Sequence, residues 1–157
     1  MNEIIKRITI RALHENDRVP YDLLLTADPS TDNINGYLKQ GECNVAVLDD
    51  RIVGAYVLLQ TSPKTMEIMN IAVDAACQGK GIGRLLIQNA MELAKVYGAK
   101  TLEIGTGNSS LHQLGLYQKC GFRITGIERD FFTKHYTEEI WENGIKCVDM
   151  IRLSMDL

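Results

Sequence analysis

Apolar and polar residues alternate with a period of two in several short runs of the chain, which predicts strands with one buried face. In the first run, Ile4, Ile8 and Ile10 alternate with charged or polar residues, so we expect an opening strand over residues 4–11. Later runs rich in β-branched and apolar residues predict strands at 43–48, 52–59, 65–73, 101–104, 122–127 and 147–153. The chain therefore predicts a sheet of about seven strands.

A second periodicity, with apolar residues three and four positions apart, predicts helices between these strands. It is strongest over residues 81–97, where Ile82, Leu86 and Leu93 belong to one apolar stripe. Shorter helices are expected at 17–25, 32–40 and 109–119. Residues 128–146 fit neither pattern, and we expect them to be irregular.

The composition narrows the class of protein. With 157 residues, of which 45% are hydrophobic and 24% charged, the chain is expected to form one soluble domain over residues 1–157. The formal net charge of −3 argues against nucleic acid as a partner. No apolar run is long enough to cross a membrane. Residues 1–11 lack the apolar stretch of a secretion signal, so we expect a cytoplasmic protein.

The residue types that most often bind metals give no sign of a metal site. The four cysteines lie far apart in the sequence, which favours free thiols in a reducing compartment. The three histidines, His14, His112 and His135, also lack the spacing of metal ligands. We therefore expect no metal cofactor.

The most informative segment is Gln78-Gly79-Lys80-Gly81-Ile82-Gly83, between the predicted strand 65–73 and the long helix. Its glycines let the backbone turn sharply and let a ligand approach bare N–H groups. The first N–H groups of a helix have no partner within it and lie at its positive end, so the segment suits a phosphate. It is neither a P-loop, because Lys80 is followed by glycine, nor a dinucleotide fingerprint, because Arg84 stands where the last glycine is needed. The alternative is a glycine turn that only permits close packing.

The remaining pattern, Gln-x-x-Gly-x-Gly, resembles the acyl-coenzyme A signature of the GNAT superfamily of N-acyltransferases. A second segment, Gly115–Phe122 with Asn108 ahead of it, is similar to the family's Asn-x(n)-Leu-Tyr-x-Lys-x-Gly-Phe motif. The resemblance implies an α/β (α+β) fold, with a single mixed, mostly antiparallel sheet of about seven strands flanked by about four helices. It also implies that the fourth and fifth strands, 65–73 and 101–104, splay apart around acyl-CoA.

For the cofactor, the resemblance assigns the pyrophosphate to the glycine-rich segment, with Lys80 or Arg84 adding charge at its rim. The main chain of residues 71–73 would pair with the pantetheine amides as an added strand does, and one of its N–H groups would stabilise the oxyanion. Asn108 would touch the pantetheine arm. The cofactor-binding residues implied in this way are Ile71, Ala72, Val73, Gln78, Gly79, Lys80, Gly81, Ile82, Gly83, Arg84, Asn108 and Tyr117.

The resemblance also implies a proton donor and a base. Tyr117 matches the phenol that protonates the departing thiolate, and the alternative is a core tyrosine on the buried stripe of its helix. Glu67 and Glu103 match positions at which two branches of the family keep the base that deprotonates the amine. Apolar neighbours flank both glutamates, so burial should raise their pKa values, whereas the alternative is an outward-facing charge. Asn70 is assigned either to the pocket or to an ordinary surface hydrogen bond.

These features predict an enzyme that moves the acetyl group of acetyl-CoA to a primary amine by direct attack, through a tetrahedral intermediate. The acceptor stays open between a small molecule and a protein N-terminus or lysine. The aromatic and acidic segment 130–142 should cover the acceptor side, where Glu138, Glu139 or Glu142 would attract a cationic amine. The alternative for this segment is packing on the sheet or against a second subunit in a homodimer. An acyl-CoA sensor without turnover, or a transferase of longer acyl groups, remains an alternative function.

Overall fold

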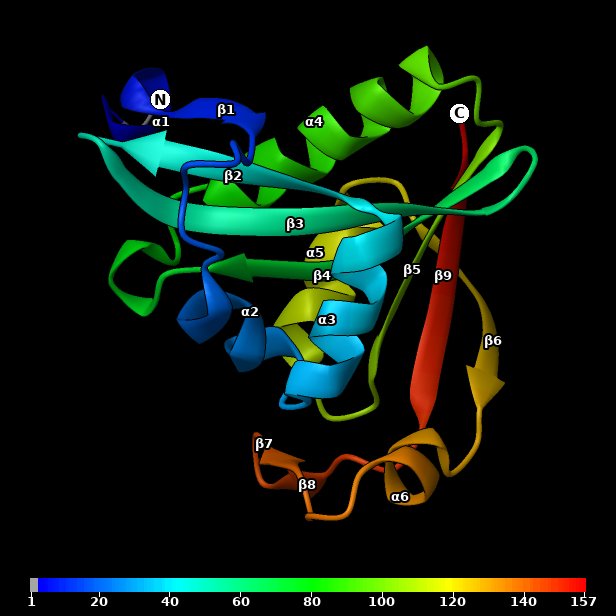
Figure 1. Cartoon of the computed structure of the whole chain (residues 1–157). Coiled ribbons are helices and arrows are strands. Elements are labelled where there is room, and N and C mark those ends of the chain that lie inside the picture. The colour runs from blue at the N-terminus through cyan, green and yellow to red at the C-terminus, as the bar shows by residue number, and fades with distance from the viewer. Residues whose placement is uncertain (1–2) are drawn as a thin grey trace.

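The computed structural model describes residues 3–157, and residues 1 and 2 of the predicted domain 1–157 lie outside the described part. The strands of its main sheet are β1 (Thr9–Ala12), β2 (Glu42–Leu48), β3 (Arg51–Ser62), β4 (Thr65–Val73), β5 (Thr101–Gly107), β6 (Arg123–Glu128) and β9 (Met150–Asp156). They lie in the order β1-β2-β3-β4-β5-β9-β6 (Figure 1). Only β4 and β5 pair in parallel; the other neighbours in this sheet are antiparallel. The predicted mixed, mostly antiparallel sheet is confirmed.

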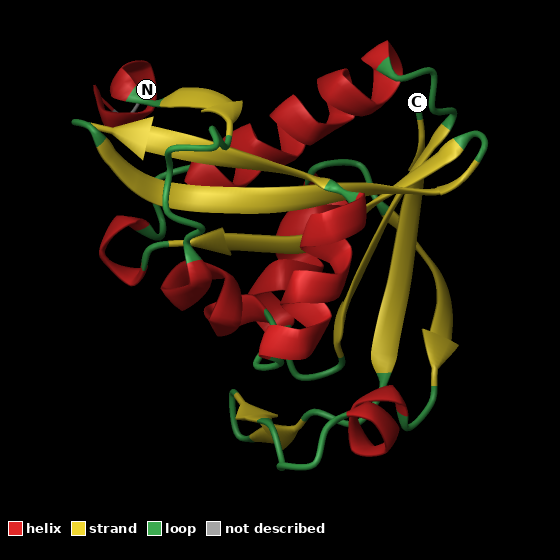
Figure 2. Ribbon diagram, viewed as in Figure 1, coloured by secondary structure: helices red, strands yellow, loops and turns green. Residues whose placement is uncertain are grey.

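Helices cover both faces of this sheet (Figure 2). In residues 3–157 they are α1 (Glu3–Arg7), α2 (Tyr21–Ala27), α3 (Thr31–Gln40), α4 (Ile82–Val96), α5 (Leu111–Lys119) and α6 (Phe131–His135), with a 3₁₀ turn, η1 (Ala75–Cys77). One hydrophobic cluster packs the sheet against α4 and α5, and a second packs it against α2 and α3. The described chain therefore has more helices than the four expected, but the same layered arrangement.

Strand β3 shows how the sequence builds the two layers. Tyr56 and Leu58 belong to the cluster on the α4 side, whereas Ala55 and Val57 belong to the cluster on the α2–α3 side. Neighbouring side chains of a strand point to opposite faces, so an uninterrupted apolar run is what a strand buried on both faces requires.

The fourth and fifth strands separate at a β-bulge. The parallel ladder runs from Thr65 opposite Thr101 to Ile68 opposite Ile104. In the ladder with β3, the partners of Leu58 and Val57 are Ile68 and Asn70, so Met69 is an extra residue in β4. A bulge bends its strand, and from this point β4 and β5 diverge (Figure 1). The predicted splay is confirmed.

The predicted opening strand over residues 4–11 is wrong in its first half. Residues 3–7 form α1, and the strand begins only at Thr9. Ile4, Ile5 and Ile8 all pack against the cluster on the α4 side. Adjacent residues of a strand point to opposite faces, whereas positions three and four apart, such as Ile5 and Ile4 relative to Ile8, lie on one face of a helical turn. The alternation of isoleucine with polar residues therefore led to the wrong prediction of a strand at the start of this segment.

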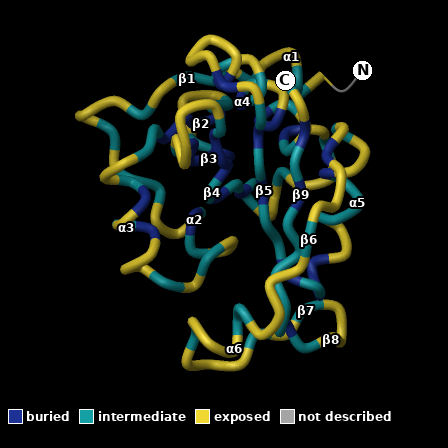
Figure 3. Tube along the Cα trace, turned by 90° about the vertical axis from the view of Figure 1, so that its right-hand side faces the viewer, coloured by how far each residue is buried: buried dark blue, intermediate teal, exposed yellow. Residues whose placement is uncertain are grey.

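The segment predicted to be irregular, residues 128–146, contains α6 and a small antiparallel hairpin of β7 (Trp141–Glu142) and β8 (Ile145–Lys146). Its turn, Asn143-Gly144, has φ angles of 56° and 74°. Asn-Gly is the preferred sequence for a two-residue hairpin turn, so this signal was present in the sequence and was missed. Most of the segment is exposed or half-buried (Figure 3).

Several element boundaries also differ from those expected, for example the ends of β3 and β5, which lie three residues later at Ser62 and Gly107. The helix expected at 17–25 begins at Tyr21, because Asp17 instead accepts hydrogen bonds from Arg11 and from the main chain of His14. The last strand, expected at 147–153, runs from Met150 to Asp156.

Candidate active site

The glycine-rich segment forms the turn between β4 and α4, called the glycine corner here (residues 78–83). Gln78 Nε2 donates a hydrogen bond to Val73 O at 3.1 Å, which ties the turn to the end of β4. Gly79 and Gly81 have φ angles of 76° and 91°. Such left-handed backbone costs other residues about 1–3 kcal/mol, so the corner requires glycine at both positions.

The third glycine has a different role. A Cβ at Gly83 would lie 3.2 Å from Leu116 Cδ2 of α5 and 4.0 Å from Val73 Cγ2, so Gly83 lets α4 pack closely. Ile82 beside it is buried in the core, and Lys80 is half-buried at the corner. The packing alternative therefore accounts for Gly83, whereas the two left-handed glycines shape the turn.

The start of α4 presents main-chain donors at the corner. Its first intrahelical hydrogen bond joins Leu85 N to Gly81 O at 3.1 Å, so the N–H groups of residues 82–84 precede it. The 15-residue helix adds the positive end of its dipole at the same place. The Arg84 guanidinium donates to Lys119 O at 3.4 Å, which holds its charge beside the corner. The arrangement suits an anion.

The second half of β4 has one free edge. Ile71, Ala72 and Val73 pair with residues 54–56 of β3, and over the described chain the ladder with β5 stops at Ile68. The opposite edge of β4 therefore faces the gap with its main-chain donors and acceptors. An extended ligand that carries amides can pair with such an edge.

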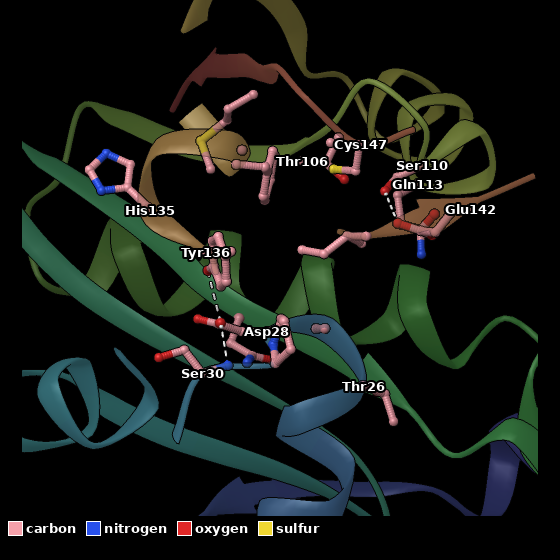
Figure 4. A pocket seen from close by; sticks show the side chains of 18 of the residues that line it. Thr26, Asp28, Ser30, Thr106, Ser110, Gln113, His135, Tyr136, Glu142 and Cys147 are labelled. Atoms are coloured by element: carbon pink, nitrogen blue, oxygen red, sulfur yellow. Dashed lines mark hydrogen bonds between the residues drawn. The ribbon is translucent and has the colours of Figure 1, made fainter. Parts of the chain in front are cut away.

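The gap opens into a cleft of about 990 Å³ (Figure 4). Its walls are β4 around the bulge (residues 68–71), the second half of β5 (104–107), α5, the loop after α2, and the segment 132–142. Residues 132–142 thus lie along one side of the cleft, and their contact with the acceptor stays a prediction.

Tyr117 reaches the cleft from α5. Tyr117 is 4% exposed, and its ring packs edge-on against the ring of Phe122, with the ring centres 6.1 Å apart. Burial raises the pKa of the phenol, so it keeps its proton at neutral pH. Tyr117 is therefore both a core residue and a proton-bearing group at the cleft.

The two predicted bases face each other in the parallel ladder but lie outside the cleft wall. Glu67 pairs with Glu103 in the register of β4 and β5, and neither belongs to the residues that line the cleft. Arg152 of β9 donates to both carboxylate oxygens of Glu67, at 3.1 and 3.4 Å. Burial raises the pKa of Glu67, and Arg152 opposes this effect. A catalytic role for either glutamate stays a prediction.

Asn108 is occupied by the main chain. Its Nδ2 donates to Lys146 O at 3.1 Å, and its Oδ1 accepts from Val148 N at 2.8 Å and from Asp149 N at 3.0 Å. Asn108 does not belong to the residues that line the cleft. Its side chain fixes the approach to β9, so contact with the pantetheine arm stays a prediction.

A hydrogen-bond network that the sequence did not reveal crosses the cleft (Figure 4). Asp28 accepts hydrogen bonds from Tyr136 OH at 2.9 Å and from Tyr37 OH at 3.2 Å. Asn33 Nδ2 donates to Tyr136 OH at 3.3 Å, and Asn70 Nδ2 donates to Tyr37 OH at 2.9 Å. Asp28, Tyr136 and Asn70 line the cleft, so the pocket interpretation of Asn70 holds. Because Tyr136 lies more than a hundred residues from Asp28, no local pattern links them.

The hairpin β7–β8 is attached to the start of α5. Ser110 Oγ donates to Glu142 Oε1 at 2.9 Å, and Asn143 Nδ2 donates to Ser109 O at 2.8 Å. These contacts hold Glu142 against the cleft, where Glu138 and Glu139 also lie.

The described chain also bears on metals and membranes. Within residues 3–157, no three His, Cys, Asp or Glu side chains gather in a way that would hold a metal ion. None of the helices in this range combines the length and apolar character of a membrane span. All four cysteines are free thiols, as predicted.

Comparisons relate the chain to known proteins. The model of the acetyltransferase (GNAT) family matches residues 10–122. The uncharacterised N-acetyltransferase YvbK of Bacillus subtilis (strain 168) is 55% identical over 153 residues, which cover 98% of this chain and 99% of the relative.

Two solved structures are also similar. A GNAT family acetyltransferase from Elizabethkingia anophelis, with acetyl-CoA bound, has a TM-score of 0.94 and 50% sequence identity, covering 96% of this chain and 99% of the other. A Bacillus subtilis acetyltransferase in complex with CoA has a TM-score of 0.91 and 56% identity, with the same coverage. Both proteins carry the cofactor, or its product, on a fold that this chain shares.

Proposed function

The chain belongs to the GNAT family of acetyltransferases, and from this premise we propose that residues 1–157 form one domain that transfers the acetyl group of acetyl-CoA to a primary amine. The amine attacks the thioester carbonyl, a tetrahedral intermediate forms, and coenzyme A leaves as the thiol. One observation carries the proposal: the buried phenol of Tyr117 lies on a cleft of about 990 Å³ where β4 and β5 diverge.

In this proposal the glycine corner binds the pyrophosphate of acetyl-CoA. The N–H groups of residues 82–84 donate to the phosphate oxygens at the positive end of α4, and Lys80 and Arg84 add charge at the rim. The pantetheine arm follows the free edge of residues 71–73. Asn108 supports the site indirectly, through the main chain that it holds. The acetyl-CoA bound by the similar Elizabethkingia anophelis acetyltransferase supports acetyl-CoA as the ligand.

Tyr117 is the proposed proton donor. As the carbon–sulfur bond breaks, the phenol gives its proton to the sulfur, and a protonated thiol is a better leaving group than a thiolate. The raised pKa of Tyr117 favours this role, because the phenol is fully protonated before the reaction begins.

Glu67 is the proposed base. Burial raises its pKa toward the range in which a carboxylate accepts a proton from an ammonium more readily. Glu67 lies behind the wall of the cleft, since Arg152, which holds it, approaches the lining residue Met150 at 3.3 Å. A bridging water therefore carries the proton from the amine. Glu103, its neighbour in the ladder, is the second candidate.

Two measurements test the function in sequence. Calorimetry with acetyl-CoA should give binding, and a thiol-release assay with a broad panel of amines should give release that requires both enzyme and amine. Mass spectrometry then identifies the acetylated product. If no acyl-CoA binds, the proposal is rejected.

A sensor without turnover is the alternative that these assays separate. It would bind acetyl-CoA and release no thiol with any amine of the panel. A comparison of acetyl-, propionyl- and succinyl-CoA in the same assay decides whether the transferred group is acetyl.

A further inference from the structure

The cleft has an unbalanced charge. Five acidic side chains line it, and among its described lining residues none is Lys or Arg. The acidic residues are Asp28, Asp32, Glu138, Glu139 and Glu142. Only Glu139 has a cationic partner in the described chain, Lys146 Nζ at 3.2 Å. Four formal negative charges therefore face the cleft without a neighbouring cation.

Asp28 is held rigidly by neutral donors. Tyr136 OH, Tyr37 OH and Ser30 N donate to its carboxylate at 2.9, 3.2 and 3.0 Å. Burial and the Asp28 carboxylate raise the pKa of Tyr136 to about 12, so this phenol remains a neutral donor. The contacts fix the position of the carboxylate and leave its charge unneutralised.

Asn70 supports Asp28 from the bulge of β4. Its residue is 4% exposed, it lines the cleft at the bulge of β4, and its Oδ1 accepts no hydrogen bond from the described residues. Leu24 O can only accept, and it lies 2.9 Å from Asn70 Nδ2, so the orientation of the carboxamide is fixed. Asn70 Nδ2 also donates to Tyr37 OH, whose own proton goes to Asp28, so Asn70 helps to fix the carboxylate.

The same charges disfavour acceptors that carry a carboxylate. A carboxylate is normally held by Arg or Lys, and the cleft wall offers neither. A ligand with two positive charges would instead pair with Asp28 and its acidic neighbours while its reacting nitrogen lies near β4.

We infer that the acceptor is a small diamine or polyamine, with one nitrogen acetylated near Tyr117 and a second cationic nitrogen bound at Asp28. The inference rests on the proposed acetyltransferase function and names the substrate class of that site. It extends the role of the acidic lining from attraction to recognition.

Three amines with one chain length form the matched test. They are 1,4-diaminobutane, butylamine and 4-aminobutanoate, which share the reacting nitrogen and differ at the far end; the eight-carbon set repeats the comparison in a longer chain. We expect kcat/KM for the diamine to exceed that of the monoamine by at least about tenfold, and the amino acid to be the poorest. Equal values for the three would overturn the inference and leave the acetyltransferase function intact.

The variant Asp28→Asn tests the recognition site. It should lower kcat/KM for the diamine toward the value for the monoamine and leave the KM for acetyl-CoA unchanged. A merely structural role would affect both amines equally, and that result would contradict the assignment. Glu92→Gln, at an exposed position of α4, is the control and should preserve the preference for the diamine.

The variant Asn70→Ala tests the support of Asp28. Because Asn70 reaches Asp28 through Tyr37 OH, the variant should lower kcat/KM for the diamine by a larger factor than for the monoamine. An equal loss for both amines would contradict this role.

Binding measurements separate the two proposals. Calorimetric titration of 1,4-diaminobutane and of butylamine into the CoA-bound protein needs no turnover. If the diamine binds more tightly, the inference stands even where no thiol is released, and only the enzymatic function fails. If the diamine does not bind, the inference fails whatever the turnover with other amines.

Discussion

The glycine corner and the acceptor wall (residues 131–142) lie at opposite ends of the proposed site, and they are built in different ways. The corner consists of main chain, with two left-handed glycines, and the hydrogen bond from Gln78 reaches Val73, five positions back in the sequence. The acceptor wall is held by side chains, and the bonds of Tyr136 reach 103 and 108 positions back in the sequence.

This difference separates cofactor binding, which depends on main-chain groups, from acceptor recognition, which depends on particular side chains. A main-chain site recognises phosphate through N–H groups that every residue carries, so it tolerates many changes of side chain. A side-chain site changes with one substitution. The same cofactor corner can therefore serve different acceptors through different walls, and the two regions should respond to mutation in separate ways.

The largest effect is expected at Tyr117, which lies between the two regions. Tyr117→Phe should lower kcat by roughly 10²–10⁴-fold, the usual span for a positioned proton donor, and leave acetyl-CoA binding unchanged because the ring stays in place. Single-turnover kinetics and calorimetry measure the two quantities. Tyr56→Phe is the matched control: that tyrosine is also buried, donates to Asn89 Oδ1 at 2.5 Å, and should affect stability but not kcat. Near-normal turnover of Tyr117→Phe would leave this residue only a core role.

Glu67→Gln should come next, with kcat/KM lower by roughly 10²-fold at neutral pH. A base must be deprotonated to act, so the wild-type rate falls as the pH drops through the pKa of Glu67. Because burial raises that pKa, the fall should occur above the range of an ordinary glutamate. The variant should lose this acidic limb in a pH profile, whereas Glu103→Gln should keep it. The reverse pattern would transfer the role of base to Glu103.

Gly81→Ala should affect the cofactor side alone. The left-handed backbone strains any side chain by about 1–3 kcal/mol, and the altered turn should weaken acetyl-CoA binding about tenfold or more while the KM of the amine stays constant. Gly36→Ala is the control, since a Cβ there has no neighbour within 4 Å; it should raise stability by about 0.4–1 kcal/mol. Calorimetry and thermal unfolding separate the two variants. A change in amine KM alone would contradict the division between the regions.

Tyr136→Phe should give the smallest effect and only on the acceptor side. It removes the hydrogen bonds to Asp28 and Asn33, worth about 0.5–1.5 kcal/mol, so the KM of the amine should rise about two- to tenfold. The affinity for acetyl-CoA should not change. Tyr21→Phe removes a comparable bond, to Asn35 Oδ1 at 2.6 Å, away from the cleft and should leave both constants unaltered. Equal effects of the two variants would show that the bond only stabilises the fold.

The sequence predicted the regions in which local pattern determines structure. The strand at 65–73 and the glycine corner appear where expected, because alternation and glycine content act over a few residues. The helix at 3–7 was missed because Ile4 and Ile8, four positions apart, fit both the strand and the helix periodicity, and only packing decides between them.

The acceptor side was less predictable for a physical reason. Its network joins Asp28, Tyr136 and Asn70, which become neighbours only after the whole sheet has formed. The position of Glu67 behind the cleft wall depends in the same way on Arg152, 85 residues further along. The residue types indicated that carboxylates would lie near the amine. Only the fold shows which of these carboxylates face the cleft.

The extra residue in β4 has a consequence for how such clefts arise. Ile68 and Ile71 both pack on the α4 side although an odd number of positions separates them, and Met69 makes this compatible with a strand. Shortening β4 by this one residue would keep its neighbours on their present faces and straighten the strand against β5. The volume open to a substrate thus depends on the number of residues in the strand. Evolution can change this volume by inserting or deleting one residue while the pattern of buried apolar positions in the sheet stays the same.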